Sequence, residues 1–112
     1  MITLDELQRH VWKTQVEKGF EEDTNLDRKL LLAVGELTEA QNELRSGHGP
    51  REVYHNVETH KPEGFLVELA DALIRILNIA SAVGVKEHEF VDIILDKAAY
   101  NATRPFKHGK EF

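Results

Sequence analysis

The segment from Phe65 to Val83 constrains the fold of this chain more than any other. Most of its positions carry aliphatic side chains, among them Leu66, Val67, Leu69, Ala70, Leu73, Ile74, Ile76, Leu77 and Ile79. A helix that is apolar nearly all round is buried, either in a core or against a partner subunit. Polar residues interrupt the run at intervals of three, four and three, which places them on one narrow helical stripe: Glu68, Asp71, Arg75 and Asn78.

The two carboxylates on this stripe need a cationic partner. Burying an unpaired carboxylate costs roughly several kcal/mol. The preceding predicted helix, residues 26–45, carries a matching stripe of acids at Glu36, Glu39 and Glu43. If the two helices pack antiparallel, Glu36 and Glu39 face Glu68 and Asp71.

Four carboxylates in one place repel one another and have raised pKa values unless a hard cation joins them. Ligation by oxygen alone, completed by water, suits Mg²⁺ or Mn²⁺. We therefore predict a metal site built from Glu36, Glu39, Glu68 and Asp71. Two simpler interpretations remain open: Glu36 and Glu39 alone are typical of a solvated helix face, and Arg75 can neutralise Asp71 four residues earlier on the same helix.

Helical periodicity dominates the whole chain, and no convincing alternating strand is present. The length of 112 residues indicates one domain. We expect an all-α fold of four helices with one long polar connection at 47–61, completed by oligomerisation. The predicted helices run from a capping box at Thr3 to Lys18, from Leu26 to Arg45, from Pro62 to Val83 and from Lys86 to Asn101.

The composition limits the possible partners. A net charge of −6 argues against a general nucleic-acid binder, because phosphate backbones are held by clustered Lys and Arg. The absence of cysteine excludes disulfides, zinc–thiolate sites and a thiol nucleophile. No apolar run reaches the ~18 residues of a membrane span, and the N-terminus lacks a signal segment. We expect no membrane partner and a cytoplasmic location.

Cations that could bind phosphate gather near the C-terminus. Lys97, Asn101 and Arg104 are spaced by four and three, so they share a face if the last helix reaches that far. Lys97 and Arg104 alone are more typical of a cationic helix terminus. Opposite an acidic metal site, a phosphate clamp explains them better. The tail adds further basic residues at Lys107, His108 and Lys110.

Two acidic pairs and the C-terminal motif together resemble a known family. The stretch 36–39 (ELTE), then 28 intervening residues, then 68–71 (ELAD) is similar to the ExxE…ExxD signature of MazG-like nucleotide pyrophosphohydrolases. The K-x-x-x-N-x-x-R motif of residues 97–104 also fits, and the resemblance covers nearly the whole chain. It implies hydrolysis of a nucleoside triphosphate to a monophosphate and pyrophosphate, in house-cleaning or control of the nucleotide pool.

The resemblance also implies roles for individual residues. Glu36, Glu39, Glu68 and Asp71 would be the catalytic Mg²⁺ ligands, and Lys97, Asn101 and Arg104 would contact the phosphates. One carboxylate, with Glu39 as a candidate, would accept the proton of the attacking water. Trp12 and Phe20 would bind the base, although each alone is more typical of a core residue.

Two further features of the family bear on this chain. Its members form dimers or tetramers, with helices completing the site across subunits. Many members read EExxE, whereas Gly35 precedes Glu36 here. A register shifted by three would place Ala33 at an acidic position and make Glu36 the second ligand of its pair.

Two rival functions use similar residues. A di-iron carboxylate bundle needs Glu-x-x-His pairs, but the residues three after Glu36 and Glu68 are both acids. The stronger rival is a non-catalytic nucleotide-binding or regulatory helical oligomer of the same fold, which would bind Mg²⁺-nucleotide without turnover.

Overall fold

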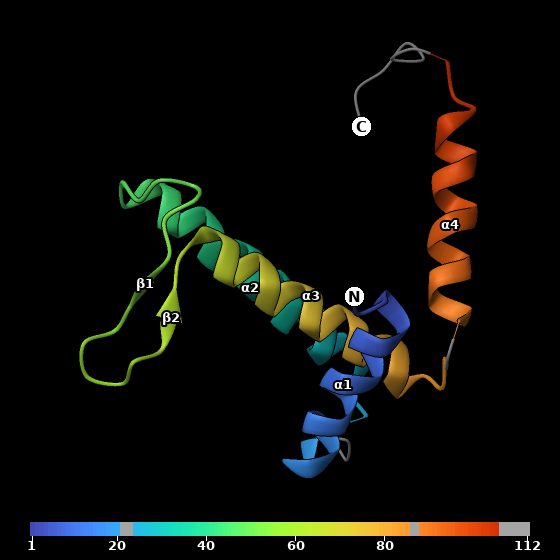
Figure 1. Cartoon of the computed structure of the whole chain (residues 1–112), viewed down its shortest axis with the longest axis horizontal. Coiled ribbons are helices and arrows are strands. Elements are labelled where there is room, and N and C mark those ends of the chain that lie inside the picture. The colour runs from blue at the N-terminus through green and yellow to red at the C-terminus, as the bar shows by residue number, and fades with distance from the viewer. Residues whose placement is uncertain (21–23, 86–87, 106–112) are drawn as a thin grey trace.

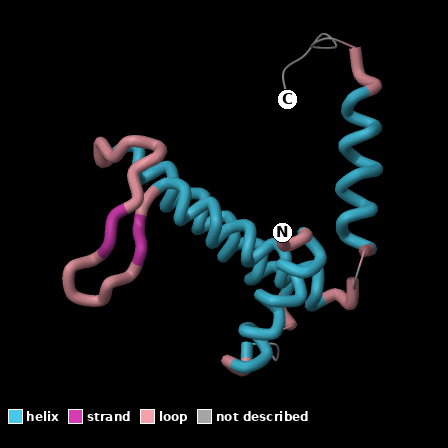
Figure 2. The backbone as a smooth tube through the Cα atoms, in the orientation of Figure 1, coloured by secondary structure: helices cyan, strands magenta, loops and turns pink. Residues whose placement is uncertain are grey.

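The computed structural model describes residues 1–20, 24–85 and 88–105, and within them the chain is helical as predicted. The helices are α1 (Leu4–Glu17), α2 (Leu26–Arg45), α3 (Phe65–Ala82) and α4 (Glu89–Ala102). Two short strands, β1 (Tyr54–His55) and β2 (Pro62–Glu63), pair antiparallel between α2 and α3 (Figure 2). Among the described helices, none has the length and apolarity needed to cross a membrane.

The long helices α2 and α3 lie side by side and antiparallel, which is the condition for their acids to face one another (Figure 1). Small side chains line their contact: Ala40 on α2 and Ala72 on α3 are almost completely buried. Leu77 is the most buried large residue, with an exposed fraction of 1%. Alanines on facing surfaces let two helix axes approach closely, which also brings the acidic stripes of α2 and α3 close together.

Side-chain hydrogen bonds cap the N-terminal ends of α1 and α2. At α1, Glu6 N donates to Thr3 Oγ1 over 3.2 Å and Thr3 N donates to Glu6 Oε1 over 3.2 Å, which confirms the predicted capping box. At α2, Asn25 is the N-cap and its Oδ1 accepts from Arg28 N. Asn25 thus has a structural role at the start of α2.

The connection between α2 and α3 differs from the prediction. Pro62 does not open the third helix but belongs to strand β2, and α3 begins three residues later at Phe65. Gly64 is the reason: its φ is +137°, and a Cβ there would collide with the carbonyl oxygen of Glu52. The chain must turn sharply at this close backbone contact before a helix can form.

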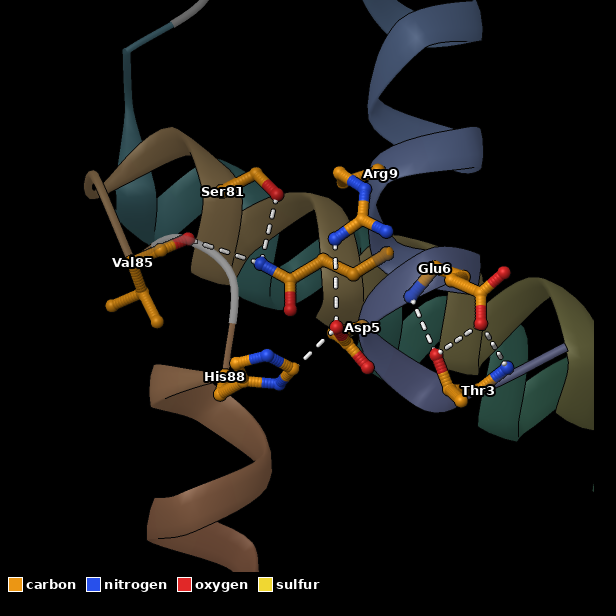
Figure 3. A network of polar contacts seen from close by, with 8 residues as sticks. Thr3, Asp5, Glu6, Arg9, Ser81, Val85 and His88 are labelled. Atoms are coloured by element: carbon orange, nitrogen blue, oxygen red, sulfur yellow. Dashed lines mark hydrogen bonds and ion pairs between the residues drawn. The ribbon is translucent and has the colours of Figure 1, made fainter.

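Helix α1 packs on the C-terminal half of α3 through a polar junction (Figure 3). The Gln8 side chain donates to Ser81 Oγ over 3.0 Å and to the Val85 carbonyl over 3.1 Å. Asp5 Oδ2 lies 3.3 Å from His88 Nδ1, at the start of α4, and also pairs with Arg9. This junction connects the beginning of α1 to both neighbouring helices.

Helix α4 stands apart from the α2–α3 pair (Figure 1). None of its residues is buried, and its apolar residues Ile93 and Leu95 are more than half exposed. The predicted start of this helix at Lys86 lies outside the described residues, and its end at Ala102 is one residue beyond the prediction. Within the described chain, α4 therefore does not close a four-helix bundle.

Candidate functional site

Three carboxylates from α2 and α3 meet across the helix pair. One oxygen from each of Glu36, Glu39 and Glu68 lies within 4.8 Å of the other two; we refer to these residues as the acid cluster. Glu68 is only 5% exposed, and its Oε2 has no hydrogen-bond partner among the described residues. Ala33 is buried in the helix contact. The two residues of α2 that face Glu68 are therefore Glu36 and Glu39. The register shifted by three, which pairs Ala33 with Glu36, does not describe this site.

Burial and the neighbouring carboxylates make Glu68 and Asp71 harder to ionise. Desolvation, followed by the contacts with Glu36 and Glu39, raises the pKa of Glu68 to about 8. Desolvation, then the charge of Glu36, also raises the pKa of Asp71, while Lys61 and Arg75 act in the opposite direction. These donors are all oxygen atoms, and one buried oxygen has no partner, which fits a hard divalent cation. A bound cation would offset both the desolvation of Glu68 and the repulsion among the carboxylates.

Asp71 and Arg75 lie beside the acid cluster without joining it. Asp71 is not one of the three converging carboxylates, although it lines a cavity together with Glu36 and Glu39. The Arg75 Nε donates to Glu36 Oε1 over 3.0 Å, so its ion pair crosses from α3 to α2. In the described chain, the intrahelical pair of Arg75 with Asp71, which the sequence left open as an alternative, is not formed.

The third acid of the α2 stripe has a different role. The Tyr54 hydroxyl donates to both Glu43 oxygens, over 2.9 and 2.8 Å, and this contact raises the pKa of Tyr54 to about 12. The His48 ring stacks on Tyr54 at a centroid distance of 4.6 Å. Glu43 therefore anchors strand β1 to α2, which the spacing of acids alone does not reveal.

A cavity of about 660 Å³ opens beside the acid cluster. We call it the first cavity. Its acidic wall is formed by Glu36, Glu39 and Asp71. Its basic wall is formed by Arg28, Lys29, Lys61 and Arg75, none of which the sequence marked as a phosphate ligand. The cavity therefore presents groups for a cation and groups for an anion within the same volume.

A second cavity of about 430 Å³ lies between α1 and α3. The two cavities share Gln15, Phe20, Ile74 and Asn78, so they adjoin. Of the two predicted base-binding aromatics, Phe20 lines both cavities and Trp12 lines neither. Apolar surface and carboxamides lie next to each other here, as in many small-molecule sites.

The predicted phosphate residues of α4 lie elsewhere. Arg104 is beyond the helix end and its guanidinium donates to Asn101 Oδ1, while the Lys97 ammonium lies 5.0 Å from the Tyr100 ring centre. The last helix does not reach Arg104, so the condition for a common helical face of all three residues is not met, and none of them lines either cavity. The spacing also does not show the direction of α4. The basic tail residues Lys107, His108 and Lys110 lie outside the described residues.

The raised pKa of Glu68 predicts an unusual pH dependence of stability. Because its folded-state pKa of about 8 exceeds the ordinary 4.5, the stabilisation is complete below 4.5 and is lost as pH rises through 8. We expect the metal-free protein to melt about 5 °C lower, or more, at about pH 9 than at about pH 6. Thermal unfolding in EDTA measures this, and added Mg²⁺ should restore the loss at the higher pH. Equal metal-free melting temperatures would show that Glu68 ionises normally.

Comparisons of the chain with protein-family models, with curated proteins and with solved structures give no match. Any function must therefore be argued from the acid cluster and the two cavities beside it.

Proposed function

We propose that this protein is a Mg²⁺-dependent nucleoside triphosphate pyrophosphohydrolase, active on ribo- or deoxynucleotides in house-cleaning or control of the nucleotide pool. The observation that carries the proposal is the convergence of the buried Glu68 carboxylate, one oxygen of which has no partner, with Glu36 and Glu39. Glu36 and Glu39 also line a cavity whose wall holds four cationic side chains. Mg²⁺ prefers carboxylate oxygens, and triphosphates bind as Mg²⁺ complexes.

The acid cluster would hold the metal, with Asp71 completing its surroundings. Bound there, Mg²⁺ would neutralise phosphate charge and position the attacking water. Hydrolysis adds the water oxygen to the α-phosphorus and breaks the bond to the oxygen that bridges to the β-phosphorus, so pyrophosphate leaves. The proton of the water needs an acceptor. Glu39 fits this role best, because its side chain is exposed whereas Glu68 is buried and Glu36 already accepts from Arg75.

The second cavity supports a place for the nucleobase. Phe20 offers a face for stacking, and the Asn78 carboxamide is buried with an unpartnered Oδ1. Aromatic faces and carboxamides are common partners of bases. Because this cavity adjoins the first, a nucleotide can place its base in one cavity and its phosphates in the other.

We also propose that the active form is a dimer or tetramer. No residue of α4 is buried, and apolar residues are exposed on both long helices, with Leu31 on α2 70% exposed and Ile76 on α3 41% exposed. Exposed apolar surface of this extent is typical of a subunit interface. A second copy would also allow Lys97, Asn101 and Arg104 to serve a site on another chain.

One observation favours the non-catalytic alternative. Arg75 already neutralises Glu36 with a direct bond, so part of the acid cluster is satisfied without metal. A nucleotide-binding oligomer without turnover would bind triphosphate tightly and release no product.

The proposal is tested by incubating the purified protein with ribo- and deoxynucleoside triphosphates and Mg²⁺, and resolving monophosphate and pyrophosphate from diphosphate and phosphate. We expect monophosphate and pyrophosphate in equal amounts, with no product in EDTA. Turnover per chain is followed over a range of protein concentration, since a site completed by a second copy loses activity on dilution. Binding of triphosphate with no product would establish the non-catalytic alternative, and release of diphosphate would overturn the proposed bond cleavage.

A further inference from the structure

Lys61 reaches the first cavity from outside the helix pair. It comes directly before strand β2, whereas the other described cations of the cavity wall belong to α2 or α3. Its charge acts to lower the pKa of Asp71, against the effect of burial, so the ammonium lies close to the acidic wall. Within the described residues, no hydrogen bond or ion pair engages this ammonium, whereas Arg75 is bonded to Glu36.

Hydrogen bonds fix the backbone of Lys61 on both sides. Its N–H donates to Thr59 Oγ1 over 3.2 Å, and its carbonyl accepts from Asn56 N over 2.9 Å. The preceding residue, His60, has a φ of +62°, which is uncommon for a residue other than glycine and persists only where the surroundings hold it. The contact between β1 and Glu43 anchors this hairpin to α2. The point from which Lys61 enters the cavity is therefore set before any ligand binds.

The hairpin and α1 lie at opposite ends of α3 (Figure 1). Strand β2 leads into the N-terminal end of α3, whereas α1 packs on its C-terminal half. Asn78, which lines both cavities, follows Glu68 by ten residues, or about 15 Å along the helix axis. The first cavity is lined by Phe20 near one end and by Lys61 from the other. A nucleotide with its base in the second cavity would thus extend its phosphate chain toward Lys61.

A cation beside a metal site is explained by an anion that contacts both. The positive charge of Lys61 opposes the binding of a metal cation at the acid cluster, because like charges repel. A phosphate between the two removes this conflict, since its oxygens can coordinate the metal and also accept hydrogen bonds from an ammonium. Glu36, Glu39 and Lys61 line one cavity, so a single ligand can reach all three.

We propose that Lys61 binds the pyrophosphate half of the nucleoside triphosphate, the β- and γ-phosphates that leave together. The inference rests on the proposed function and deepens it. The ammonium donates charge-assisted hydrogen bonds to non-bridging oxygens of this half. Negative charge gathers there as the bond to the α-phosphorus breaks, so Lys61 stabilises the leaving group. The β1–β2 hairpin thereby becomes part of the substrate site.

The test compares wild type with Lys61→Met and Lys61→Arg by calorimetric titration in the presence of Mg²⁺. One probe is a panel of nucleoside triphosphates in which a methylene group replaces the oxygen between the α- and β-phosphorus, which prevents the proposed cleavage. The other is the matching panel of nucleoside monophosphates, which lack the pyrophosphate half. Arg51→Met is the control, because Arg51 is an exposed cation of the same connection and lines neither cavity.

We expect Lys61→Met to bind the preferred triphosphate analogue about tenfold or more weakly, with monophosphate affinity within about twofold of wild type. Lys61→Arg should recover part of the loss. Without nucleotide, Lys61→Met should bind Mg²⁺ as tightly as wild type or more tightly, because a repelling charge is gone. Arg51→Met should match wild type in all three titrations.

Equal affinity of wild type and Lys61→Met for the triphosphate analogue would overturn the inference and leave the proposed function intact. A loss of the same size for the monophosphate, or weaker binding of Mg²⁺ alone, would also overturn it, because Lys61 would then support the whole site and not the pyrophosphate half. A wild-type protein that binds neither probe and hydrolyses no triphosphate would instead show that the proposed function itself has failed.

Discussion

Replacing Glu68 with Gln should reduce turnover of the preferred triphosphate by about a thousandfold or more. The substitution keeps the size of the side chain and removes the buried charge from the centre of the acid cluster. A metal contributes several kcal/mol of transition-state stabilisation, and each 1.4 kcal/mol corresponds to about tenfold in rate. Steady-state kinetics at saturating Mg²⁺ measure the loss of turnover. Titration of the nucleotide-free protein with Mg²⁺ measures the accompanying loss of metal binding.

Glu43→Gln is the matched control for this experiment. Glu43 lies on the same stripe of α2, but it is bound by the Tyr54 hydroxyl and does not belong to the acid cluster. Its substitution should leave turnover within a few-fold of wild type. Glu68→Gln should also be more stable than wild type in EDTA above about pH 8, since the uncompensated carboxylate is gone. Full activity in Glu68→Gln would remove Glu68 from the mechanism.

Gly64→Ala should lower the free energy of unfolding by about 2–4 kcal/mol, the largest stability effect that we expect from one added methyl group. The φ of +137° disfavours any side chain, and the new Cβ would collide with the Glu52 carbonyl oxygen, which belongs to the backbone and cannot swing aside as a side chain would. Either the turn opens or the start of α3 shifts. Because Glu68 lies in the first turn of α3, turnover should fall as well.

Urea denaturation measures the change, with Gly49→Ala as its control. Gly49 belongs to the same connection, but its φ is not positive and a Cβ there meets nothing within 4 Å. The control should unfold within about 0.5 kcal/mol of wild type. If Gly64→Ala were as stable as the control, the close contact with Glu52 would not limit the position at which α3 begins.

The acid cluster could be predicted from sequence because its signal is local. Glu68 interrupts an apolar helix, and a three-residue spacing places Glu36 and Glu39 on one face. Lys29 gave no such signal, since a lysine near a helix N-terminus is ordinarily solvated. Its burial arises from the packing of α2 against α3, which no spacing within α2 reveals. The two-residue strands were missed for a related reason: two residues are too short to show alternation.

The direction of α4 could not be predicted either. Periodicity shows which residues of a helix share a face, as with Lys97 and Asn101, but not which neighbour that face meets. The partner of Arg75 is a similar case, because a bond to Asp71 along the helix and a bond to Glu36 across it satisfy the same sequence pattern. Both questions depend on tertiary packing.

The absence of buried side chains in α4 has a consequence for the cooperativity of folding. A free helix of 14 residues is marginal in water, and α4 gains little from packing within one chain. In a single chain, α4 would therefore open and close without unfolding α1, α2 and α3, and its amide hydrogens would exchange with solvent at a free-energy cost well below that of global unfolding. The chain would then consist of two folding units of unequal stability, with the acid cluster in the more stable one.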